Sequence, residues 1–181
     1  MSLTPSTMSP LGSVAPVFKL LDPKTGGKIT IDVARGDKGL LVMFICNHCP
    51  YVIHLEKALI DLGLSYQNSG LGIVAISAND VVNYPQDAPE LMAKKEYCFP
   101  YLYDEDQSVA KAYDAACTPD FFLYDANLQL VYRGQFDDSR PNGSTPITGA
   151  DLKDAMDLVI AEKSIASDQT PSVGCNIKWK S

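Results

Sequence analysis

Hydrophobic positions along the chain form two kinds of pattern, continuous runs and stretches with helical spacing. Residues 40–45 and 71–76 are continuous apolar runs, which are typical of strands buried on both faces. The segment between them places apolar residues three and four positions apart, as one face of an amphipathic helix does: Val52, Leu55, Leu59 and Leu62. A strand, a helix and a strand of these lengths predict two parallel strands joined by a right-handed crossover.

Shorter patterns predict the remaining elements. Two short strands at 18–21 and 28–31 flank a glycine-containing turn and form a hairpin before the first long strand. Later segments predict helices at 89–96, 108–113 and 151–160, and strands at 101–103, 117–125 and 128–133. The last of these strands alternates apolar and polar residues, as a half-buried antiparallel strand does. We expect a flexible lead-in over residues 1–15, one domain over 16–165 and a C-terminal tail over 166–181.

Composition narrows the classes of protein. With 181 residues, 46% of them apolar and 20% charged, the chain has the composition of an ordinary globular domain. A net charge of −7 disfavours nucleic-acid binding, which needs a basic surface. No apolar run approaches the roughly 20 residues of a membrane span, so we expect no membrane insertion. The N-terminal segment lacks lysine, arginine and an apolar core, and we expect no signal peptide. Five cysteines without an export signal favour a reducing compartment, so we expect a cytoplasmic protein. The sequence does not indicate an oligomeric state.

The first apolar run leads directly into two cysteines, Cys46 and Cys49, and then into Pro50. Proline is favoured in the first helical turn, so we expect the helix to begin there. A helix start presents unpaired N–H groups and a partial positive charge, and both stabilise a thiolate. We therefore expect Cys46 to be the more exposed sulfur and the attacking nucleophile, with a pKa lowered to roughly 3.5–7.5, and Cys49 to be the resolving thiol. The imidazole of His48 would further favour the Cys46 thiolate.

Two other roles are compatible with the same cysteine pair. A structural zinc site needs about four ligands, usually as two close pairs, whereas this chain has one such pair and two histidines, His48 and His54. Two buried structural cysteines are the other alternative. A strand-to-helix junction followed by proline is more typical of redox chemistry. The sequence therefore predicts a redox dithiol, with no metal and no cofactor.

A second feature, Thr118-Pro119, opens the strand expected at 117–125. A proline here can be cis or can be an ordinary trans proline at a strand start, and the residues alone favour the trans form. Of the other cysteines, we expect Cys98 to lie in the core. Cys175 is either an inert residue of a packed tail or a resolving or regulatory thiol that reaches Cys46 or Cys117.

Residues 14–165 resemble the thioredoxin-like superfamily, and within it the redoxin branch of thiol-specific antioxidant and thiol-disulfide oxidoreductase-like proteins. The resemblance rests on the Cys46–Cys49 motif with its proline, on Thr118-Pro119 and on the order of the elements. It implies an α/β thioredoxin-like fold with a central mixed β-sheet flanked by helices. It also implies an N-terminal β-hairpin, an insertion before a cis-proline loop and a C-terminal tail.

In that fold the Thr-Pro bond is cis and its loop packs against the dithiol. The resemblance implies that Thr118 offers backbone hydrogen bonds to a bound peptide or mixed disulfide, and that Pro119 shapes the groove. Cys117 would lie close to the dithiol, as a buried filler or as a third redox thiol. The segments 81–100 and 135–149 are expected to flank the groove and to select the partner.

The chain departs from the family pattern around the dithiol. Thioredoxins carry tryptophan before the first cysteine and Gly-Pro between the pair, where this chain has Ile45 and Asn47-His48. Histidine next to the second cysteine is similar to strongly oxidising dithiol oxidases, which implies a less reducing potential than that of thioredoxin. Peroxiredoxins place threonine three residues before the reactive cysteine, where this chain has Met43.

The expected activity is thiol–disulfide exchange between the dithiol and a protein disulfide substrate, a redox partner or small-molecule thiols. One alternative is an antioxidant thiol peroxidase, in which Cys46 becomes a sulfenic acid that Cys49 resolves. Another is a metal-binding or metallochaperone protein, with Cys46, Cys49 and either His48 or Cys175 as soft ligands.

Overall fold

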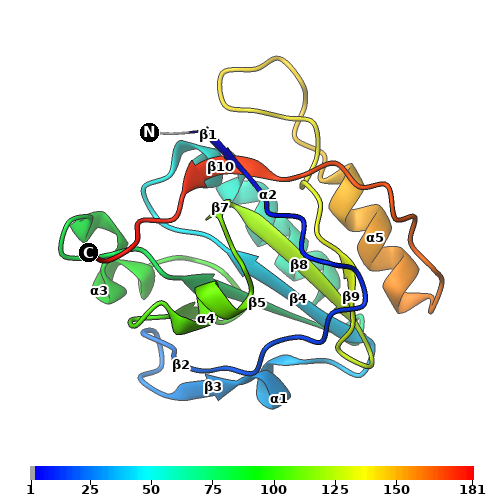
Figure 1. Ribbon diagram of the computed structural model, residues 1–181, viewed down its shortest axis with the longest axis horizontal. Helices are drawn as coiled ribbons and strands as arrows, with labels where there is room; N and C mark the ends of the chain where they lie inside the picture. Colours follow the sequence, from blue (N-terminus) through cyan, green and yellow to red (C-terminus); the bar gives the residue numbers. More distant parts are fainter. Residues whose placement is uncertain (1–2) are drawn as a thin grey trace.

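A seven-stranded mixed sheet forms the centre of the computed structural model, which describes residues 3–181 (Figure 1). Its strands lie in the order β3-β2-β6-β5-β4-β8-β9. Their bounds are β2 Lys19–Leu21, β3 Lys28–Thr30, β4 Gly39–Phe44, β5 Leu71–Ser77, β6 Tyr101–Tyr103, β8 Asp120–Asp125 and β9 Leu130–Tyr132. β4 pairs in parallel with β5 and antiparallel with β8, so the two long apolar runs lie side by side at the centre.

Helices cover both faces of this sheet. They are α1 Ile31–Ala34, α2 Pro50–Tyr66, the single-turn η1 Pro85–Asp87, α3 Pro89–Met92, α4 Ser108–Ala112 and α5 Ala150–Ile160. Successive residues of β4 point to opposite faces. Leu41 and Met43 share a core with α2 and α5, whereas Val42 and Phe44 share one with α4 and the N-terminal hairpin. β4 is therefore buried along its whole length, as its unbroken apolar run predicts.

A second sheet joins strands from near both ends of the chain with a third strand from the second half of the sequence. β1 (Leu3–Pro5) pairs antiparallel with β10 (Val173–Asn176), and β10 pairs antiparallel with β7 (Cys117–Thr118) (Figure 1). Residues 3–5 of the expected flexible lead-in therefore form a strand of this sheet. A three-residue strand ending in proline carries no recognisable pattern, and its partner lies at the far end of the sequence. Residues 1–2 of that expected lead-in lie outside the described residues.

The other expected elements are present, several with shorter bounds. The helix expected at 89–96 ends at Met92. The strand expected at 117–125 is divided into β7 and β8 at Pro119, which has no backbone N–H to donate to a ladder. Over residues 3–181, no helix is both long enough and apolar enough to cross a lipid bilayer.

Candidate active site

The dithiol lies where the central strand gives way to the longest helix. Cys46 follows β4 by two residues, and Cys49 is the N-cap of α2, whose first residue is Pro50. The predicted helix start is thus confirmed. The two cysteines are 2% and 0% exposed, respectively, so Cys46 is the more accessible thiol by a small margin. Both are reduced, as are the other three cysteines.

The loop that joins β7 to β8 packs against both thiols. Its Thr118-Pro119 peptide bond is cis, which confirms the expectation drawn from the resemblance. The Thr118 hydroxyl oxygen lies 3.6 Å from the Cys46 sulfur, and the Cys49 thiol donates to the Thr118 carbonyl oxygen at 3.2 Å. The structure therefore brings together Cys46, Cys49, Thr118 and Pro119.

A buried carboxylate, that of Asp87 at the end of η1, organises the residues between the cysteines. Its Oδ1 accepts the backbone N–H groups of Asn47 and His48 at 2.7 and 3.2 Å. Its Oδ2 lies 2.6 Å from Nδ1 of His48 and accepts from the Asn79 amide at 2.8 Å. Asp87 is fully buried, and the segment from Pro85 to Asp87 thus holds the Asn47-His48 turn in place.

His48 connects this carboxylate to the reactive cysteine. Its Nδ1 lies 4.0 Å from the Cys46 sulfur, on the same edge of the ring that faces Asp87. An ionised carboxylate only accepts hydrogen bonds, so Asp87 keeps the proton on Nδ1. The ring also stacks on Tyr84, with centroids 5.4 Å apart. The Nδ1–H of His48 therefore bonds to Asp87, and the Cys46 sulfur lies farther away beside the same positively polarised edge of the ring.

Sequence reasoning missed Asp87. The segment 81–100 was expected to flank the groove, but no feature distinguishes this aspartate from the other acidic residues of the chain. The only local signal is its position between Pro85 and Pro89, which predicts a turn and not a role.

The lowered pKa lies on Cys49 and not, as the sequence predicts, on Cys46. The hydrogen bond to Cys49 keeps the proton on Cys46, and burial and the negative charge of Asp87 further raise the pKa of Cys46. Hydrogen bonds from Cys46, from Cys175 and Thr118, and from the Val52 backbone lower the pKa of Cys49 to about 4. The expectation of a lowered pKa at Cys46 is therefore wrong for the reduced pair. The helix starts at Pro50, so its free N–H groups face Cys49 and not Cys46.

The three remaining cysteines occupy different surroundings. Cys98 is exposed, so its expected place in the core is wrong. Cys117 is buried, its thiol donates to the Pro119 carbonyl oxygen at 3.5 Å, and burial raises its pKa. Cys175 lies on β10 and contacts Cys49 through a hydrogen bond; burial raises its pKa to about 12. The tail therefore packs onto the domain and adds a third thiol to the dithiol.

Pro119 also lines a surface pocket beside the dithiol. α2 contributes Tyr51 and His54 to its wall, and the loop after β9 contributes Ser139 and Arg140. The first residues of segment 135–149, which was expected to flank the groove, thus line a pocket together with Pro119.

The sequence pattern that defines the AhpC/TSA family matches residues 11–133, more than half of the chain. The chain belongs to the AhpC/TSA family. The family and the paired thiols support a role in thiol redox chemistry. The chain matches none of the curated proteins with which it was compared.

Solved structures of two relatives share the whole fold of this AhpC/TSA protein. An uncharacterized conserved protein from Geobacillus kaustophilus is 47% identical, with a TM-score of 0.97 over 99% of this chain and 97% of that one. A hypothetical protein from Sinorhizobium meliloti 1021 is 46% identical, with a TM-score of 0.95 over 98% and 99% of the two chains.

A more distant structure supports the fold class. The thioredoxin domain of a thiol-disulfide oxidoreductase from Bacteroides vulgatus is 19% identical, with a TM-score of 0.57 over 74% of this chain and 91% of that one. The fold is therefore thioredoxin-like, an α/β fold with a central mixed sheet flanked by helices, as the sequence predicts.

Proposed function

We propose that this protein is a thiol-disulfide oxidoreductase that cycles between a Cys46–Cys49 dithiol and disulfide. One observation carries the proposal: the two thiols are hydrogen-bonded to each other and both rest against Thr118, beside a cis proline. Two thiols in this arrangement share one proton and one negative charge. Thiol–disulfide exchange requires such a thiolate.

The reaction begins when the proton of Cys46 moves along the hydrogen bond to Cys49. The Cys46 thiolate attacks a disulfide R–S–S–R′, the S–S bond breaks, and R′S⁻ leaves from a Cys46–S–S–R mixed disulfide. Cys49 then gives its proton to the departing thiolate and attacks the Cys46 sulfur. RS⁻ leaves, the Cys46–Cys49 bond forms, and the two electrons of the dithiol have reduced the substrate disulfide.

His48 acts on the first step. As negative charge develops on Cys46, the positively polarised Nδ1–H edge of His48 lies beside it, and Asp87 keeps that edge in place. The Asp87 charge opposes the Cys46 thiolate, and the intervening His48 separates the two. Asp87 is thus a positioning residue, whereas Cys46 and Cys49 are the catalytic ones.

Trapping the mixed disulfide tests this proposal. In a Cys98→Ser background, which removes the exposed thiol, the reduced protein is mixed with glutathione disulfide. The dithiol protein should release two glutathione molecules and form Cys46–Cys49. Cys49→Ser should stop with glutathione on Cys46, and Cys46→Ser should react far more slowly. Glutathione on Cys49 as the first product would contradict the assigned order.

Metal binding is a second candidate, because sulfur, nitrogen and oxygen atoms of Cys46, His48 and Asp87 lie within 4.8 Å of one another. This set replaces the expected ligands Cys49 and Cys175 with a carboxylate. Metal analysis of the purified protein tests it: a stoichiometric transition metal lost in Cys46→Ser would favour this role. The peroxidase alternative needs the same Cys46 thiolate, so stopped-flow measurement of peroxide consumption separates it from disulfide exchange.

The substrate class that fits the site is a protein disulfide, held along the cis-proline loop and the pocket lined by Tyr51, His54 and Arg140. The cytoplasmic location expected from the sequence stays a prediction, which cell fractionation tests.

A further inference from the structure

Cys175 shares the face of the second sheet that meets the dithiol. In the β10–β7 ladder it lies directly opposite Thr118, and residues opposite each other in an antiparallel pair project to the same side. The Thr118 side chain contacts the Cys46 sulfur, so that side faces the active pair. The Cys175 thiol accordingly forms a hydrogen bond with the Cys49 thiol, and Cys175 is only 3% exposed.

Gly174 allows β10 to come this close. A Cβ atom at this position would lie 2.0 Å from the Thr118 carbonyl oxygen, the same oxygen that accepts from Cys49. The Ser172 hydroxyl also donates to the Pro119 carbonyl oxygen at 2.7 Å. The tail is therefore held against the cis-proline loop just before Cys175, the residue that it projects toward Cys49.

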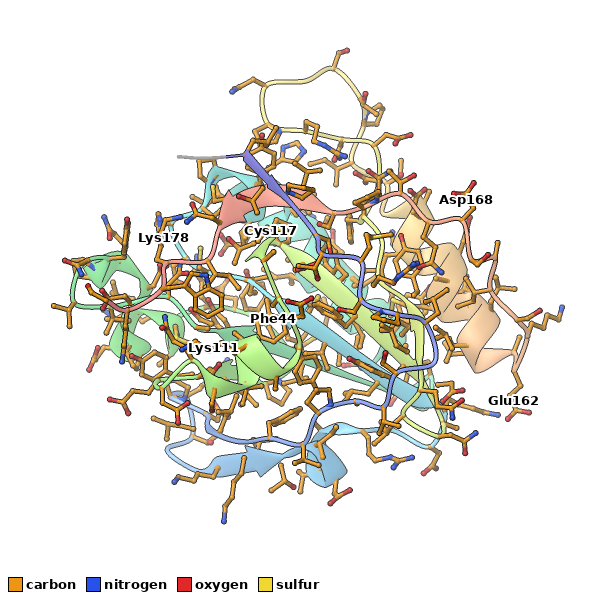
Figure 2. The ribbon with its side chains drawn as sticks, in the orientation of Figure 1. Phe44, Lys111, Cys117, Glu162, Asp168 and Lys178 are labelled. Carbon is orange, nitrogen blue, oxygen red and sulfur yellow. The ribbon has the colours of Figure 1, made fainter. Side chains whose placement is uncertain are left out.

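Cys117 lacks this placement, although it neighbours Thr118. Successive residues of a strand point to opposite faces, so Cys117 projects away from the side shared by Thr118 and Cys175. Asn176 of β10 lies opposite it, and Figure 2 shows Cys117 at the start of β7, next to β10. Of the two accessory cysteines expected from the sequence, only Cys175 is directed at the dithiol.

We propose that Cys175 is a third redox thiol, which exchanges the Cys46–Cys49 disulfide for a buried Cys49–Cys175 disulfide. The proposal rests on the proposed function, because it begins with the oxidised pair. The Cys175 sulfur attacks the Cys49 sulfur, the Cys46–Cys49 bond breaks, and the Cys49–Cys175 bond forms. Cys46 leaves with both bonding electrons and takes the proton that Cys175 loses, so no external oxidant or reductant is consumed.

After the exchange, the disulfide no longer includes Cys46, the reactive cysteine. Cys49 and Cys175 are 0% and 3% exposed, so the new disulfide is buried, as the one that it replaces is. Cys46, the more accessible cysteine of the pair, returns to the thiol form beside His48. The protein thus has two oxidised forms with the same electron count and different reactive groups.

Disulfide mapping after oxidation tests this directly, in a Cys98→Ser background to remove the exposed thiol. Cys46→Ser, oxidised with diamide and digested after alkylation, should lose the alkylatable thiols of Cys49 and Cys175 and yield a peptide pair joined by these two residues. A Cys117→Ser addition should leave that result unchanged, and a Cys175→Ser addition should abolish it.

The same measurement on the protein with Cys46 intact keeps the test independent of any folding defect in Cys46→Ser. Oxidised with glutathione disulfide, it should contain both Cys46–Cys49 and Cys49–Cys175, and only the first after Cys175→Ser. Cys46–Cys49 alone would overturn the role of Cys175 and leave the proposed function standing. Absence of both disulfides would overturn the two proposals together.

Discussion

Removing the imidazole of His48 should slow the chemistry of Cys46. His48→Ala deletes the N–H that faces the Cys46 sulfur at 4.0 Å, and it leaves the Asp87 carboxylate unshielded. A hydrogen bond to a charged group contributes about 1.5–3 kcal/mol, and 1.4 kcal/mol is a factor of about ten. Both effects disfavour the thiolate, so we expect Cys46 to alkylate about 10- to 100-fold more slowly near pH 7.

The assay follows iodoacetamide labelling of the Cys46 peptide by mass spectrometry in a Cys49→Ser, Cys98→Ser background. His54→Ala is the matched control, because His54 contacts Ser139 and neither thiol of the pair. Adding Asp87→Asn to His48→Ala should restore much of the rate. The repulsion that it removes, over at most 4.8 Å, is at least about 3.5 kcal/mol at an effective dielectric constant of about 20. Equal rates for His48→Ala and His54→Ala, or a further loss with Asp87→Asn, would refute the reasoning.

Three further predictions concern the cis-proline loop and its neighbours. Thr118→Val removes a hydrogen bond that lowers the pKa of Cys46, so alkylation of Cys46 should slow about five-fold in the same assay. Burial raises the pKa of Asp120 to about 7. As the pH rises from about 4 to 7, the unfolded chain therefore releases a proton that the folded protein keeps, and the free energy of unfolding falls by about 4 kcal/mol. Asp120→Asn should remove that loss, as measured by urea unfolding. If the variant and the wild type differ in stability by the same amount at about pH 4 and pH 8, the raised pKa is contradicted. Gly174→Ala should cost about 1–3 kcal/mol in urea unfolding, because its Cβ would meet the Thr118 carbonyl oxygen, and a cost under about 0.5 kcal/mol would contradict that contact.

The parts of the fold that local pattern determines could be predicted from the sequence. The apolar run at 40–45, the proline at 50 and the helical spacing that follows act within a few residues of one another, and they located the dithiol and its helix. β1 escaped prediction because a strand of three residues has no period, and its stability comes from pairing with β10.

The electrostatics of the site depend on contacts between distant segments, which the sequence does not reveal. Asp87 contacts Asn47 and His48 across separations of 40 and 39 residues. The lowered pKa of Cys46 was predicted from the helix start and from the neighbouring His48. That reasoning omitted the buried carboxylate and the hydrogen bond to Cys49, both of which raise the pKa. The cis form of Thr118-Pro119 came from the family resemblance and not from the residues themselves.

Redox titration of the Cys46–Cys49 pair tests the central claim most directly. The protein is equilibrated in glutathione buffers of graded potential, its thiols are tagged by mass, and Cys49→Ser serves as the control. Because a lowered Cys49 pKa stabilises the reduced form, we predict one two-electron transition at a potential above the roughly −270 mV of thioredoxin. Absence of a disulfide involving Cys46 and Cys49 at every potential would contradict the account.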